Sequence, residues 1–155
     1  MKRVPHSVLD YNEDDGLYYH DGLPFTGVSY TVGGNARLEG EAEYRDGVVW
    51  GLARSWHPSG LPASEAHCAR GVWDGIRREW NESGRLRLEE AYEKGVCLCR
   101  KRWDEQGSLV EDYRLRESDP DFETLKLARE WASNMEQPES AAPRPSGGNN
   151  EGAEK

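Results

Sequence analysis

An internal repeat of about 24 residues most constrains what this chain can fold into. Gly47, Gly71 and Gly95 are spaced 24 residues apart, and Trp56 and Trp80 follow the same spacing. Each unit holds two short segments that alternate between apolar and polar residues, separated by Asp-Gly, Ser-Gly or Gln-Gly pairs typical of tight hairpin turns. A unit this short cannot form a core of its own, so neighbouring units are expected to stack.

The alternation is clearest between residues 37 and 44. Leu38 and Tyr44 fall on one face of a predicted strand, while Glu39, Glu41 and Glu43 fall on the other. Four such units cover residues 16–115, the first of them looser than the rest. The sequence therefore predicts a mainly β protein, an elongated antiparallel meander of stacked β-hairpins in a single sheet, half-apolar on one face and charged on the other.

A helix is predicted after the last repeat, at residues 119–135. Ser118 or Asp119 can cap its N-terminus, and Pro120 suits the first helical position. We expect this helix to cap the end of the repeat array, with an apolar stripe facing the last hairpins; the alternative is a helix that docks a partner. Residues 1–136 are expected to form one domain. The segment 137–155 is too polar to bury a core and is predicted to be disordered. The stripe consists of Leu125, Ala128, Trp131, Ala132 and Met135.

Charge and hydropathy narrow the classes of partner. The 29 acidic and 20 basic residues leave a net charge of −9, which disfavours nucleic acid because its binders carry basic patches. No apolar run is long enough to cross a membrane, and the N-terminus lacks the apolar core of a signal peptide. We therefore expect a cytoplasmic protein whose partner has a basic surface.

The residues that usually carry chemistry form no recognisable catalytic or metal motif. Cys97 and Cys99 are two residues apart, which is not the usual spacing of a zinc knuckle, and Cys97 falls in the same repeat position as Trp73. The four histidines are scattered, and the glycines precede hairpins and not helices. We therefore expect no enzyme activity, no metal and no cofactor.

Two sets of residues are candidates for contacting a partner. Trp50 and Trp73 lie near the turn glycines at the edges of hairpins, where each is either a packing residue or an interface anchor. The acidic stripe of Glu39, Glu41 and Glu43 is either a solvated face or a surface that attracts a positively charged protein.

The repeated pattern, together with the segment from Tyr19 to Gly27, resembles the MORN-repeat-variant proteins, and in particular the bacterial YwqK-type antitoxins. The resemblance covers about residues 16–115. It implies stacked hairpins with a binding surface. It also implies an immunity protein, often encoded beside a polymorphic toxin, that binds its cognate toxin and occludes the active site or substrate groove.

The alternative is a repeat scaffold that binds lipid or organises a protein complex. Arg77-Arg78 and the basic segment 100–102 are local patches for such a role, but the net charge of −9 opposes binding to lipid headgroups. The sequence leaves open the oligomeric state and whether the sheet edges are capped within one chain.

Overall fold

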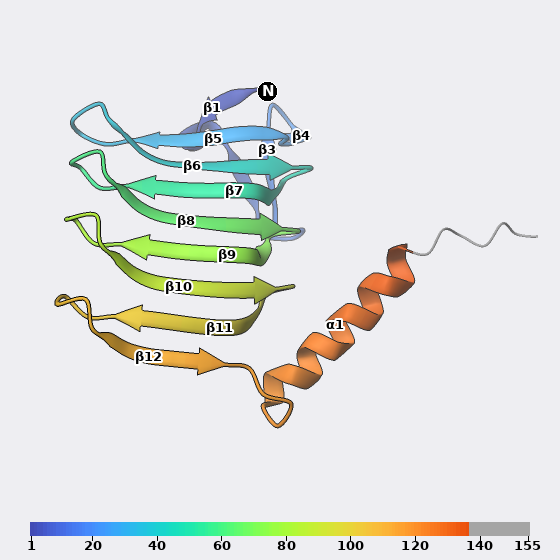
Figure 1. Cartoon of the computed structure of the whole chain (residues 1–155). Coiled ribbons are helices and arrows are strands. Elements are labelled where there is room, and N and C mark those ends of the chain that lie inside the picture. The colour runs from blue at the N-terminus through green and yellow to red at the C-terminus, as the bar shows by residue number, and fades with distance from the viewer. Residues whose placement is uncertain (137–155) are drawn as a thin grey trace, which may run out of the picture.

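The computed structural model describes residues 1–136, and the predicted disordered segment 137–155 lies outside the described residues. A nine-stranded sheet dominates the fold, and its last eight strands form an antiparallel meander in chain order (Figure 1). The mainly β, antiparallel prediction is confirmed. Its strands are β1 (Arg3–Pro5), β5 (Gly27–Val32), β6 (Leu38–Arg45), β7 (Val48–Trp56), β8 (Pro62–Ala69), β9 (Val72–Trp80), β10 (Leu86–Glu93), β11 (Val96–Trp103) and β12 (Leu109–Arg114).

Two kinds of turn fix the hairpins. At one end of the strands the turns are tight, and their two central residues both have positive φ, for example 50° at Asp46 and 86° at Gly47. This is the geometry of the tight two-residue hairpin. At the other end of the strands the loops are longer and are stabilised by hydrogen bonds to side chains. The Asn81 Oδ1 atom, for instance, accepts hydrogen bonds from the backbone N–H groups of Ser83 and Arg85. The repeated sequence therefore specifies both kinds of turn.

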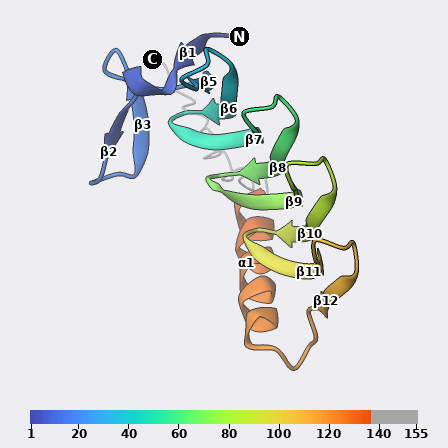
Figure 2. The ribbon, with the colours of Figure 1, turned by 90° about the vertical axis from the view of Figure 1, so that its left-hand side faces the viewer.

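The N-terminal end departs from the regular meander. The looser first unit is split between two sheets: its second half joins the large sheet as β5, while its first half pairs with residues 10–12 in a separate three-stranded sheet, which Figure 2 shows beside the stack. Aromatic side chains explain this, since Tyr18 lies against Tyr44 with ring centroids 5.4 Å apart, and Val4, Phe25 and Tyr44 form the buried cluster. Strand β1 then pairs in parallel with β5. The added elements are the 3-10 helix η1 (His6–Val8), β2 (Asp10–Asn12), β3 (Leu17–His20) and β4 (Leu23–Pro24).

The predicted C-terminal helix is present as α1 (Pro120–Glu136). It lies along the row of tight turns and not across the outer edge of β12 (Figure 1), and Arg129 ties it to Glu93 at the end of β10 through two hydrogen bonds of 2.8 and 2.7 Å. Leu125 and Ala132 are buried, whereas Trp131 and Met135 are exposed. The predicted apolar stripe is therefore wrong in part, because a helix seated on a narrow edge buries only one side.

Candidate functional site

One row of directly opposed residues crosses the whole sheet and changes character halfway. Directly opposed residues share a face, so the row lies on one side of the sheet, here called the groove face. From β5 to β8 it holds Ser29 and three alanines, and from β9 onward it is charged. In this row, small uncharged side chains therefore occupy only the first half of the sheet. The row is Ser29, Ala42, Ala53, Ala66, Arg77, Glu90, Arg100 and Tyr113.

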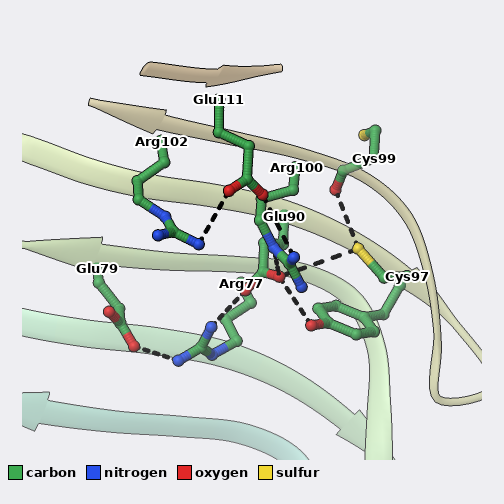
Figure 3. A network of polar contacts seen from close by, with 9 residues as sticks. Arg77, Glu79, Glu90, Cys97, Cys99, Arg100, Arg102 and Glu111 are labelled. Carbon is green, nitrogen blue, oxygen red and sulfur yellow. Dashed lines mark hydrogen bonds and ion pairs between the residues drawn. The ribbon is translucent and has the colours of Figure 1, made fainter. Parts of the chain in front are cut away.

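Glu90 is the centre of the charged half and is only 2% exposed. Arg100 donates to its carboxylate from Nε at 2.6 Å, and the Tyr92 hydroxyl donates at 2.8 Å. Arg77 donates to the other carboxylate oxygen, and the Cys97 Sγ atom lies 3.9 Å from the oxygen that Arg100 and Tyr92 share (Figure 3). A buried carboxylate is costly unless it is paired and hydrogen-bonded, and here both oxygens are occupied.

The same arginines continue the network toward the sheet edge. Arg77 also donates to Glu79, and Arg100 reaches Glu111 at 3.3 Å. Arg102 pairs with the second oxygen of Glu111 at 3.0 Å. Acidic and basic side chains therefore alternate across four strands. Together with Tyr92 and Cys97, these side chains are here called the Glu90 network.

Protonation in the Glu90 network follows from this geometry. Burial alone would raise the pKa of Glu90, but hydrogen bonds from Arg100, Tyr92 and Arg77 outweigh it and leave the pKa below its ordinary value. Burial and the hydrogen bond to Glu90 raise the pKa of Tyr92 to about 12. Burial also raises the pKa of the Cys97 thiol, against the opposing effect of Arg100. At neutral pH the carboxylate is charged, the phenol neutral and the thiol protonated.

The Glu90 network forms one wall of an open groove of about 810 Å³. Trp73 stands in this groove, 41% exposed. Its ring meets Tyr92 edge to face with centroids 5.0 Å apart, and the guanidinium of Arg77 lies 4.4 Å from its centroid. Trp73 therefore packs on the Glu90 network while part of its ring faces solvent.

Trp50 belongs to a different surface. It occupies the repeat position of Asp74, one residue after that of Trp73, and neighbours in a strand point to opposite faces. A second hollow, of about 490 Å³, lies between the tight turns and α1 and is lined by Trp50, Arg70 and Trp131. The Arg70 guanidinium lies 5.8 Å from the Trp50 ring and 5.7 Å from the Trp131 ring. The structure thus separates the two predicted tryptophans.

The three predicted acidic residues differ in their surroundings. Glu41 pairs with Arg54 at 2.5 Å and with Arg3 at 3.1 Å. Burial would raise the pKa of Glu41, but those two arginines lower it overall. Glu43 accepts a hydrogen bond from the Leu52 N–H at 2.6 Å, whereas Glu39 is exposed. Two of the three carboxylates are therefore engaged within the chain.

Two features escaped the sequence reasoning. The Glu90 network depends on strand register, and the signal was available, because the turn glycines fix which residues of β9, β10 and β11 oppose one another. The outward side of α1 was also missed. It carries Leu127, Trp131 and Met135, each more than half exposed. Within residues 1–136, no group of three or more His, Cys, Asp or Glu side chains is arranged to hold a metal ion. The same residues include no helix with the length and apolar character needed to span a membrane.

The fold and its surfaces define a β-meander repeat protein with a polar groove on one side and an aromatic edge beside its helix. Comparison with known protein families gives no match, and no solved structure matches either. The chain is similar to a curated protein, immunity protein YwqK of Bacillus subtilis (strain 168), with 33% identity over 132 residues. The match spans 85% of this chain and 82% of that relative. The chain therefore belongs to the family of immunity protein YwqK.

Proposed function

We propose that this protein is an immunity protein that binds a cognate toxin in the cytoplasm and neutralises it by covering its active site or substrate groove. The similarity to immunity protein YwqK over 85% of the chain carries the proposal. Occlusion requires tight association and no chemical step of its own.

The charge of the chain supports a toxin with a basic surface. A net charge of −9 on 155 residues attracts a positively charged protein over a distance set by the ionic strength and raises the association rate. Of the predicted contact residues, Glu39 is exposed while Glu41 and Glu43 are engaged internally. We therefore propose that Glu39 contributes to steering, and that Glu41 and Glu43 contribute mainly to the fold.

Co-expression tests the proposal directly. A candidate toxin domain, sought among the genes beside that of this protein, is induced in a sensitive host, with or without this chain. We expect growth to be restored only with this chain, and a one-to-one complex to be recovered by size-exclusion chromatography. Growth arrest that persists at high levels of folded immunity protein would refute the proposed function.

A further inference from the structure

The outward side of α1 carries a stripe of large apolar side chains, here called the helix stripe: Leu127, Trp131 and Met135. They are 64%, 56% and 63% exposed, respectively. Residues four positions apart lie above one another on a helix, so the three form one continuous line. The opposite side of the helix is already seated, because Leu125 is 1% exposed and Ala132 8%. The stripe is therefore not what attaches the helix to the sheet.

The helix stripe continues into the hollow beside it. Trp131 lines that hollow together with Trp50, Val72 and Ala128, so apolar surface extends from the helix onto the tight turns. The Arg70 guanidinium lies beside both indole rings, and the Arg45 guanidinium lies 4.4 Å from the centroid of the Trp50 ring. A contiguous exposed apolar patch of this kind on a soluble domain marks a contact surface, and Trp and Arg are enriched among residues that dominate binding.

The charges beside the stripe indicate the chemistry of its partner. Glu123 and Glu130 are both exposed and are seven residues apart, which places them two turns apart on the same flank of the stripe. Two cations lie near them: Lys126 pairs with Glu123 at 3.4 Å, and Arg129, next to Glu130, points to the sheet, where it pairs with Glu93. An apolar line with an acidic flank is complementary to an apolar groove with a basic rim.

We propose that the helix stripe, with Trp50 beside it, inserts into an apolar groove of the toxin whose rim carries Lys and Arg side chains. This inference rests on the proposed function and specifies the surface that carries it out. Trp131 is the central anchor, Leu127 and Met135 fill the groove on either side, and Glu123 and Glu130 pair with the rim. The groove face is not part of this contact.

The test uses the full chain and the candidate toxin domain of the co-expression experiment. The variant Leu127→Ala/Trp131→Ala/Met135→Ala removes the stripe while keeping residues that favour helix. Ser133→Ala is the matched control, because this residue is exposed on the same helix away from the stripe and its flank. We expect the triple variant to weaken toxin binding at least 100-fold by calorimetry and to lose growth rescue, with an unchanged circular dichroism spectrum. The control should bind as the unaltered chain does.

The outcomes separate this inference from the proposed function. Rescue by the unaltered chain and equally by the triple variant overturns the helix stripe as the contact while the immunity role stands. No rescue by the unaltered chain refutes the immunity role and this inference with it. A dimer of the unaltered chain that becomes monomeric in the triple variant, with rescue intact, assigns the stripe to a second copy and overturns the proposal.

The charge component has a separate readout. Glu123→Lys/Glu130→Lys keeps the apolar stripe and reverses its flank. We expect this variant to slow association with the toxin domain at least tenfold at low salt and to change dissociation much less. An unchanged association rate would contradict the basic rim.

Discussion

The Glu90 network and the helix stripe involve similar residue types but have opposite roles. In the Glu90 network, two arginines and a tyrosine surround a carboxylate that is 2% exposed, and both arginines lie on neighbouring strands. In the helix stripe, a tryptophan beside an arginine keeps 56% of its surface in solvent. The interactions of the first region therefore stabilise the fold, whereas the side chains of the second region remain exposed to a partner.

This difference comes from position in the array. The Glu90 network lies on central and outer strands of the sheet, over which residues 1–136 place no second layer, so opposed side chains must satisfy one another across strands. The helix rests on a narrow row of turns, where one side is enough to attach it. Four substitutions or conditions test this division, in order of decreasing effect on stability.

Replacing Glu90 with alanine should produce the largest effect. It leaves two arginines facing each other across a buried site, and removing one partner of a buried pair costs about 3–5 kcal/mol. Urea denaturation should show this loss in the free energy of unfolding. Glu79→Ala is the matched control, because Glu79 contacts the same Arg77 but its side chain is 42% exposed. A loss at Glu90 no larger than that at Glu79 would contradict a structural role for the network.

Replacing Leu125 with alanine should have the second largest effect. Leu125 is 1% exposed and seats α1, and such a truncation costs about 2–3 kcal/mol. Hydrogen exchange should show faster exchange in residues 120–136 and unchanged exchange in β9 and β10. Equal loss of protection in both regions would mean that the helix and the sheet unfold as one unit.

The sequence predicted those parts of the fold that depend on local chemistry. The 24-residue spacing of glycines identified the hairpins, because two successive residues with positive φ, such as Asp46 and Gly47, are needed at each tight turn. Ser118, Asp119 and Pro120 similarly predicted the start of α1. The separate N-terminal sheet was missed, since contacts such as that between Tyr18 and Tyr44 join residues far apart in the chain.

The candidate surfaces were predicted less completely. Alternation assigned Glu41 and Glu43 to a charged face but did not show that Arg54 and the Leu52 N–H engage them. The heptad-like spacing on α1 was recognised, yet Trp131 and Met135 were placed toward the sheet. Which side of an amphipathic helix is buried depends on the shape of the surface it meets, and a row of turns offers contact to one side only.

Lowering the pH should remove the stabilisation from the Glu90 network over a pH range that the pKa of Glu90 determines. The pKa of Glu90 is lowered in the folded state, so the unfolded state binds more protons near its ordinary pKa of about 4.3. The stabilisation from Glu90 is complete above that pH and is lost as the pH falls through the folded pKa. Thermal denaturation from pH 7 to pH 3 should therefore show a steeper fall for the unaltered chain than for Glu90→Gln. An equal fall in thermal stability for the two proteins would contradict the lowered pKa of Glu90.

Replacing Trp131 with alanine should have the smallest effect on stability and so sharpens the comparison most. More than half of the ring is exposed, and surface substitutions usually change the free energy of unfolding by less than about 0.5 kcal/mol. The contact with Arg70 adds about 0.5–1 kcal/mol at most, because it is solvent-exposed. Urea denaturation of this variant should thus differ from the unaltered chain by less than about 1.5 kcal/mol, well below the loss at Glu90. A larger loss would place Trp131 among the residues that hold the helix, and the distinction between a region that stabilises and a region that binds would fail at that residue.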